Sequence, residues 1–229
     1  MQRSSFQFVL RSATFSVFAA VIVFLSGCAN MTGTAPPSSI VGPQFKGSVY
    51  GGQQPIAATH VYLYAANGAG GYGSASTSLM QNVAGTTDDG TGNFYVTTDG
   101  NGNFSYGGTF TCPTPTTQVY LLGLGGNATG IPASPSNDAI TLAAPLGNCS
   151  NLGPATFTNV DEITTVAMAY ALNAFMTDPT HVGSPATNTA ALNNAFATVN
   201  SLVDTSFGIA LATTPNGALI CSMLQRWLS

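Results

Sequence analysis

Apolar and polar residues alternate with a period of two through the first half of the chain. The clearest case is 60–65, where Val61 and Leu63 alternate with His60, Tyr62 and Tyr64. This period places successive side chains on opposite faces of a β-strand. We therefore expect a strand with one aliphatic and one aromatic face, and similar runs predict strands at 45–50, 94–98, 103–106 and 119–124.

Turn-forming residues separate these runs. Residues 51–55 break any helix after the first strand, and residues 99–102 (Asp-Gly-Asn-Gly) accept the positive φ of a tight hairpin. The Thr-Thr-Asp sequence that ends in Gly-Asn-Phe occurs at 86–94 and again at 97–104, which predicts two turn-plus-strand units in tandem. Residues 67–84, rich in Gly, Ser and Ala, predict a long surface loop.

After Thr158 the apolar period becomes helical. Asn159 and Glu162 predict a capping box, and Asp161 adds a favourable charge at the positive end of the helix. The apolar stripe of this first helix is Ile163, Val166, Ala167, Tyr170 and Ala174, with a stop at Pro179. A second helix is expected from Thr187 or Asn188 to Asp204, with the stripe Leu192, Ala195, Phe196, Val199 and Val203.

The N-terminus carries an export signal. An apolar run at 13–25 follows Arg3 and Arg11 and is shorter than the roughly 20 residues that cross a bilayer, as in a signal-peptide core. It ends in Leu25-Ser26-Gly27-Cys28, which resembles the bacterial lipobox, where the signal is cut before a cysteine that carries lipid. The resemblance implies a lipid anchor on Cys28, and Ala29 in place of Asp implies the outer membrane or cell surface. The alternative is a buried cysteine after a plain secretory signal.

Four regions follow from these patterns: a signal peptide (1–27), a flexible tether rich in Thr, Ser, Gly and Pro (28–43), a strand region (44–157), and a helical hairpin with a C-terminal tail (158–229). The predicted fold class is mainly β with a C-terminal α-helical hairpin, a β-sandwich packed by two helices. Residues 28–229 hold only Lys46 and Arg226 against eight carboxylates, a formal charge of −6. So few cations argue against nucleic-acid binding.

Export permits disulfides. Cys112 and Cys149 each lie beside turn residues that could bring strand ends together, so we predict that they pair, which leaves Cys221 as the odd cysteine. The alternative is three free thiols.

Short motifs across residues 44–124 resemble carboxypeptidase regulatory-like domains. They are Gly47-Ser48-Val49, Pro55-Ile56-Ala57, Val61-Tyr62-Leu63-Tyr64, Thr98-Asp99 and Gly102-Asn103-Phe104. The resemblance implies a transthyretin-like, immunoglobulin-like β-sandwich that serves as an accessory or adhesive module of secreted and surface proteins. Residues 111–113, 118–121 and 161–167 are also similar to uncharacterised bacterial secreted proteins.

No catalytic motif is present in the sequence: it lacks a Gly-x-Ser-x-Gly elbow, a phosphate-binding loop, a His-Glu-x-x-His and a Cys-x-x-Cys. His60 and His181 are expected to be structural or solvent-facing, and no enzyme activity or cofactor is predicted. A weak calcium candidate consists of Asp99, Asn101 and Asn103, for which a hairpin turn is the competing explanation.

Two functions remain open. The first is a cell-envelope lipoprotein that binds a protein or glycan, or acts as a spacer; an open aromatic face, which could stack on sugars, would favour it. The second is an accessory domain of a larger secreted enzyme or transport assembly, truncated in this chain, which an acidic pocket would favour. Five tyrosines could form the aromatic face or, alternatively, fill the strand face under the helices: Tyr62, Tyr64, Tyr72, Tyr95 and Tyr106.

Overall fold

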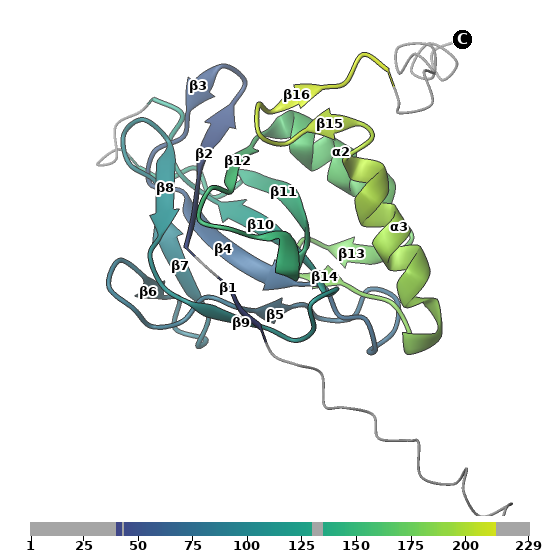
Figure 1. Ribbon diagram of the computed structural model, residues 1–229. Coiled ribbons are helices and arrows are strands. Elements are labelled where there is room, and N and C mark those ends of the chain that lie inside the picture. Colours follow the sequence, from purple (N-terminus) through teal and green to yellow (C-terminus); the bar gives the residue numbers. More distant parts are fainter. Residues whose placement is uncertain (1–39, 43, 130–134, 214–229) are drawn as a thin grey trace, which may run out of the picture. The chain divides into compact units, whose positions relative to one another are not determined.

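The computed structural model describes residues 40–42, 44–129 and 135–213. Cys28, the signal peptide, most of the tether and Cys221 lie outside these residues. The described chain is mainly β, with a few short helices (Figure 1). Within it, no helix is both long enough and apolar enough to cross a bilayer.

The larger sheet is antiparallel and has the strand order β11–β10–β4–β7–β6, with β5 also paired to β4. Its centre is the pair β4 and β10, in which Leu121 lies opposite Leu63 and Tyr120 opposite Tyr64. Both strands are buried on both faces, as expected of strands that carry apolar residues at nearly every position. The strands of this sheet are β4 (His60–Ala65), β5 (Thr77–Ser78), β6 (Thr87–Asp88), β7 (Phe94–Thr97), β10 (Gln118–Leu124) and β11 (Thr141–Asn148).

The smaller sheet is built around β2, which pairs with β3 and β8 in antiparallel fashion and with β12 in parallel. Outside this sheet, β1 pairs with β9. The strands are β1 (Ile40–Gly42), β2 (Phe45–Gly51), β3 (Gln54–Pro55), β8 (Asn103–Tyr106), β9 (Phe110–Cys112) and β12 (Phe157–Val160).

The two sheets share one apolar core. Val61 and Leu63 of β4 and Leu121 of β10 belong to the same buried cluster as Phe45 and Val49 of β2. The aliphatic face predicted for 60–65 therefore points towards the smaller sheet, which confirms the alternation and shows which layer each face meets.

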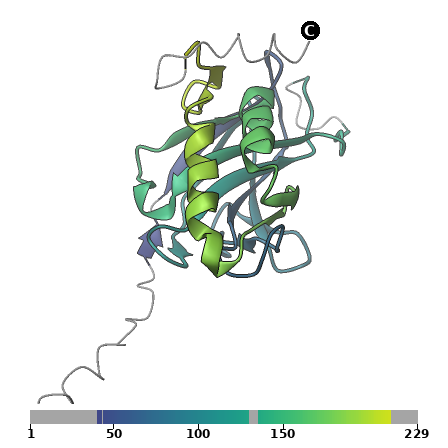
Figure 2. The same ribbon diagram turned by 90° about the vertical axis from the view of Figure 1, so that its right-hand side faces the viewer.

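The opposite face of the larger sheet is covered by α2 (Glu162–Leu172) and α3 (Thr189–Val199), which lie side by side (Figures 1 and 2). A second buried cluster lies there and combines Tyr62, Tyr64 and Tyr120 with Met168 and Phe196. The aromatic face of β4 thus packs under the helices.

The first helix ends at Leu172, before the predicted stop at Pro179, and this earlier end lengthens the connection between the helices. The connection contains the small hairpin β13 (Met176–Asp178) and β14 (His181–Val182) and a 3-10 turn, Ala186–Asn188. The second helix ends at Val199, earlier than the predicted Asp204, because β15 (Val203–Asp204) pairs with β16 (Ile209–Ala210).

The apolar stripe predicted for the first helix was largely wrong: of its five members only Ala167 is buried. Ile163, Val166 and Tyr170 are exposed, whereas the face that packs on the sheet carries Thr164, Met168 and Leu172. The reason is a pair of hydrogen bonds that attach the first turn of α2 to β11. The Thr164 hydroxyl donates to the Ala143 carbonyl (2.9 Å), and the Ala143 N–H donates to Oγ1 of Thr165 (2.8 Å), so α2 covers the open edge of β11.

The cap of α2 also differs from the prediction. Asp161 is the N-cap: its Oδ1 accepts from the Thr164 N–H (2.8 Å), and the Thr164 hydroxyl accepts from the Asp161 N–H (3.0 Å). Glu162, predicted as the other half of the box, instead accepts from the Gly52 N–H (2.6 Å).

The tandem turn-plus-strand units are confirmed. Asp89 accepts from the Thr91 N–H (2.8 Å) before β7, and Asp99 accepts from the Asn101 N–H (2.9 Å) before β8. Each aspartate therefore closes its own turn in the same way, as Asp residues do in Asx-turns. The hairpin predicted at 99–102 was wrong, because this turn joins β7 of the larger sheet to β8 of the smaller sheet.

The predicted disulfide between Cys112 and Cys149 is present, with Cα atoms 6.0 Å apart. It joins the end of β9 to the 3-10 turn Cys149–Asn151 that follows β11, across 37 positions of sequence. Both cysteines are buried.

Loss of this disulfide is expected to lower the free energy of unfolding by about 2–4 kcal/mol, because the cross-link restricts the unfolded chain. Urea denaturation of the Cys112→Ala, Cys149→Ala double variant measures the loss. Dithiothreitol should destabilise the wild type by a similar amount and leave the double variant unchanged. Equal stability of wild type and variant would contradict this role.

The cap of α2 gives a second test. Asp161→Ala should cost about 1 kcal/mol in urea denaturation, because the Thr164 N–H loses its acceptor, whereas Asp161→Asn keeps an acceptor and most of the stability.

Burial raises the pKa of Asp161. Its ionisation thus opposes folding. The contribution of Asp161 to the free energy of unfolding is therefore complete below the unfolded pKa of about 4 and is lost as the pH rises through the folded pKa. Asp161→Asn should remove that pH dependence of the free energy of unfolding. If Asp161→Asn lost as much stability as Asp161→Ala, the capping role of Asp161 would be wrong.

Candidate functional site

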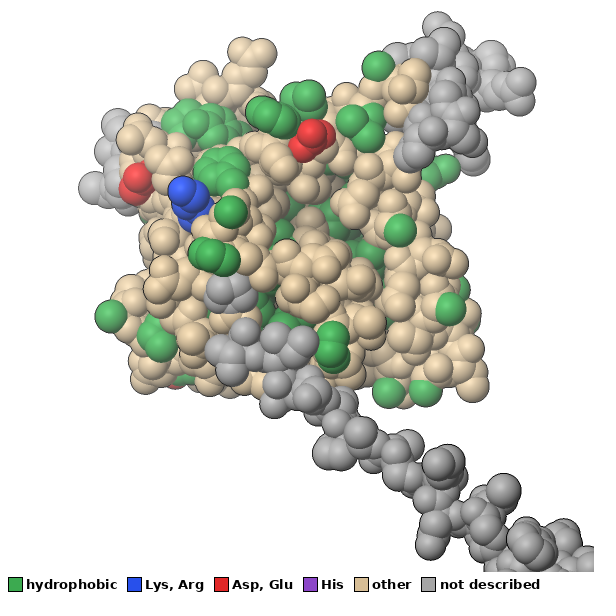
Figure 3. All heavy atoms as spheres, in the orientation of Figure 1, with side chains coloured by type: hydrophobic (Ala, Val, Ile, Leu, Met, Phe, Trp, Pro, Cys, Tyr) green, Lys and Arg blue, Asp and Glu red, His purple; other side chains and the backbone are tan. Residues whose placement is uncertain are grey.

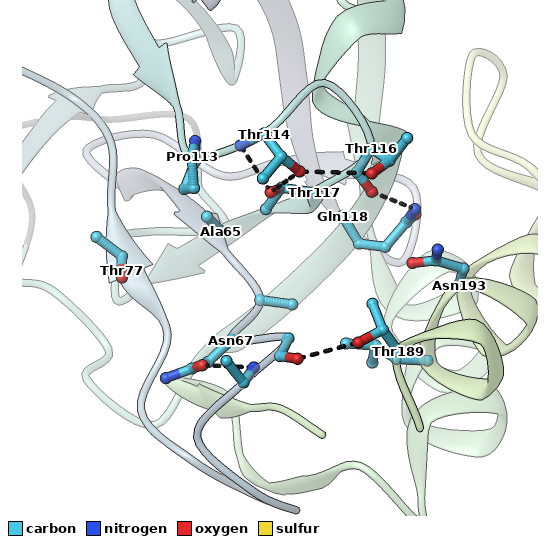
Figure 4. Close-up of a pocket in the computed structure, with 14 residues that line it drawn as sticks. Ala65, Asn67, Thr77, Pro113, Thr114, Thr116, Thr117, Gln118, Thr189 and Asn193 are labelled. Carbon is cyan, nitrogen blue, oxygen red and sulfur yellow. Dashed lines mark hydrogen bonds between the residues drawn. The ribbon is translucent and has the colours of Figure 1, made fainter. Parts of the chain in front are cut away.

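A pocket of about 450 Å³ opens where β4 ends and β10 begins, beside the first turn of α3 (Figure 4). The central strand pair fixes this place, since the Ala66 N–H donates to the Gln118 carbonyl (2.9 Å). Three segments far apart in sequence form the walls that make up most of its lining, 65–69, 113–118 and 189–193, and Thr77 of β5 completes it.

The first wall is the turn after β4. Oδ1 of Asn67 accepts from the N–H groups of Ala69 (3.1 Å) and Gly70 (2.8 Å), and Nδ2 of Asn67 donates to the Ala75 carbonyl (3.3 Å). The Asn67 side chain is thereby committed to holding the loop in shape. Small residues on this wall, Ala65, Ala66 and Ala69, leave the space open.

The second wall is a turn rich in threonine. The hydroxyls of Thr114 and Thr117 lie 2.8 Å apart, and Thr117 Oγ1 also accepts from the Thr114 N–H (3.1 Å). Gln118 donates to the Thr116 carbonyl (3.2 Å) and is hydrogen-bonded to the side chain of Asn148. These bonds fix hydroxyl and amide groups along the rim.

The third wall is the start of α3. The Thr189 hydroxyl donates to the Gly68 carbonyl (3.0 Å) and so ties the helix to the first wall. Asn193, one turn further on, points towards Gln118 across the pocket (Figure 4). Within the described part of the chain, the Asn193 side chain has no hydrogen-bond partner, so its amide is available to a ligand.

The polar side chains that line the pocket are all neutral: threonine hydroxyls and the amides of Asn67, Gln118 and Asn193. These groups both donate and accept hydrogen bonds. The face drawn in Figure 3 also has few charged side chains. The pocket therefore suits a ligand that is polar but uncharged.

The predicted aromatic face does not form a binding surface. Tyr62 and Tyr64 are buried under the helices, Tyr106 is buried between the sheets, and Tyr95 is half-buried. Only Tyr72 is exposed, and its hydroxyl accepts from Nδ2 of Asn188 (2.7 Å). The alternative interpretation, that these tyrosines fill the strand face, holds for Tyr62 and Tyr64.

The two histidines lie apart and outside the pocket. The His60 ring stacks on Tyr95, with ring centroids 4.0 Å apart, and this partial burial lowers the pKa of His60. His181 lies on β14, where its Nδ1 is 2.8 Å from Oδ2 of Asp178. The hydrogen bond from His181 lowers the pKa of Asp178.

The weak calcium candidate forms the turn before β8. Oδ1 of Asp99 accepts from the N–H groups of Asn101 (2.9 Å) and Asn103 (2.8 Å), so the turn alternative explains these residues. In the described ranges, no cluster of three or more His, Cys, Asp or Glu residues could hold a metal ion.

The pocket could not be predicted from the sequence. The composition predicts a loop at 67–84, turn residues beside Cys112 and a helix start near 188, but it does not indicate that these segments meet. Neutral residues such as Asn193 and Thr117 carry no motif, so only the three-dimensional arrangement identifies them.

Comparisons with protein-family models, curated proteins and solved structures gave no match. The function must therefore be argued from the chemistry of the pocket and from the sequence features that lie outside the described residues.

Proposed function

We propose that this protein is a non-enzymatic lipoprotein of the cell envelope whose β domain binds an uncharged polar ligand, and that this ligand is a neutral glycan. The observation that carries the proposal is the pocket between β4, β10 and α3, which offers hydroxyl and amide groups and no charged side chain.

Sugars match these groups. Their hydroxyls donate and accept hydrogen bonds, as does the side-chain amide of Asn193, whereas Gln118, whose two N–H groups already have partners, can accept through Oε1. Their C–H faces need apolar contacts, which Leu192 and the alanines of the first wall supply. The volume of about 450 Å³ lies in the range of small-molecule sites. Because the pocket contains no acidic side chain, it does not favour the alternative of an accessory domain for an enzyme or transport assembly.

We further propose that residues 44–157 form a transthyretin-like sandwich related to carboxypeptidase regulatory-like domains. The positions of the motifs support this proposal: Gly47-Ser48-Val49 lies in β2, Val61-Tyr62-Leu63-Tyr64 in β4, and Gly102-Asn103-Phe104 at the turn into β8. Domains of that family serve as accessory or adhesive modules, which agrees with a surface binding role.

The anchor completes the proposal. Lipid on Cys28 would hold the protein at the outer membrane or cell surface, with residues 29–43 as a spacer. Each buried CH₂ of an acyl chain contributes about 0.8 kcal/mol, so two or more chains give stable attachment.

The pocket is tested by glycan-array binding of the purified full chain, followed by titration with the best neutral glycan. Asn193→Ala should weaken binding about tenfold, because a hydrogen bond worth about 1–1.5 kcal/mol is lost. The neighbouring substitution Asn194→Ala is the control, since Asn194 is exposed on the same helix and does not line the pocket. Binding restricted to charged glycans, or equal losses in the two variants, would overturn the proposal.

The anchor is tested separately. Mass spectrometry of the membrane fraction should find an acylated peptide that begins at Cys28. Cys28→Ser should abolish acylation and shift the protein to the soluble fraction. Normal processing and salt-resistant membrane attachment of Cys28→Ser would refute the anchor and leave the pocket untouched.

A further inference from the structure

A stripe of large apolar side chains runs along the solvent side of α2. Ile163, Val166 and Tyr170 are 42%, 67% and 65% exposed. Their spacing of three and four residues places them on one helix face, away from the Thr164, Met168 and Leu172 face that packs on the sheet. Single exposed apolar residues are common, but a continuous stripe on a helix indicates a surface that is normally covered.

The chain itself returns to this helix. Gly208 packs against the Asp161 carboxylate at the start of α2, with no room for a Cβ atom. The next residues, Ile209 and Ala210, form β16, which lies against α2, and Ile209 is 52% exposed. The described residues end at Thr213, five positions after Gly208, so residues 214–229 follow in sequence a segment that lies against α2.

The sequence of this last segment has an amphipathic pattern. A turn-forming Pro215-Asn216-Gly217 precedes 218–228, in which apolar residues recur every four positions. They are Leu219, Ile220, Met223, Leu224, Trp227 and Leu228, whereas Ser222, Gln225 and Arg226 occupy the other side of a helical wheel. As a helix these 11 residues would span about 16 Å, the same length as the 11 residues of α2.

We propose that residues 218–228 form a helix that packs its apolar side on the Ile163, Val166 and Tyr170 stripe and completes the helical layer. The short link from Thr213 favours this occupant over a second copy of the chain. A short tether gives an effective concentration of about millimolar, far above that of a separate molecule in dilute solution.

Trp227 is the only tryptophan of the chain and reports directly on the contact. In the full chain its emission should lie at shorter wavelength than in the urea-unfolded chain. Val166→Asp should shift the emission to longer wavelength and increase quenching by acrylamide, because a charge on the stripe opposes docking. Asn194→Asp, at an exposed position of α3 outside the stripe, should change neither quantity.

If Val166→Asp changes neither the emission wavelength nor the acrylamide quenching of Trp227, the proposal is wrong. This holds both for a tryptophan that is exposed in water and for one that is buried in a lipid or detergent phase. An emission shift that accompanies dissociation of a dimer on dilution would also overturn it, in favour of a second copy.

A cross-linking experiment provides an independent check. Ile163→Cys, Val166→Cys and Tyr170→Cys each place a thiol on the stripe that the docked segment with Cys221 would cover. At least one should form a disulfide with Cys221 of the same chain, identified by mass spectrometry of the linked peptides, whereas Asn194→Cys should not. Links only between different chains, or equal links from Asn194→Cys, would contradict docking.

Discussion

The pairing of β4 with β10 is the constraint on which the rest of the structure depends. Its register sets Leu63 opposite Leu121 on one face and Tyr64 opposite Tyr120 on the other. The first face builds the core between the sheets, and the second forms the floor under the helices. A slip of one residue would exchange the two faces and so break both cores. The same pairing also brings the end of β4 to the start of β10, where the pocket opens.

Much of the β region could be predicted because its signals are local. The alternation at 60–65 and the two Asp-Gly turns depend on neighbouring residues only, and the cysteines flanked by turns suggested the disulfide. The packed face of α2 could not be predicted in this way. Its decisive residue, Thr164, counts as polar in a hydropathy pattern, yet it is fully buried because its hydroxyl bonds the Ala143 carbonyl. The open edge of β11 thus determines how the helix is rotated.

The candidate site illustrates a different limit. Asn67, Thr117 and Asn193 come from three segments that meet only in the folded chain, and none of them is charged. Sequence motifs for catalysis or metal binding depend on charged or nucleophilic residues at fixed spacing, so a neutral pocket assembled from distant loops has no such signature. The tyrosines were a more conspicuous signal, but Tyr62 and Tyr64 serve the second core.

In the described residues the one contacting pair of side chains that can carry opposite charges is Asp178 with His181, which forms an ion pair when the imidazole is protonated, and it is exposed. Salt screens interactions between exposed charges. Because apolar cores, a disulfide and neutral hydrogen bonds stabilise this domain, salt should change its free energy of unfolding little. The same scarcity of charge removes long-range steering of a ligand, which accelerates the association of many charged partners. Encounter with the pocket is then governed by diffusion alone, and its rate should be the same in dilute and in saline surroundings.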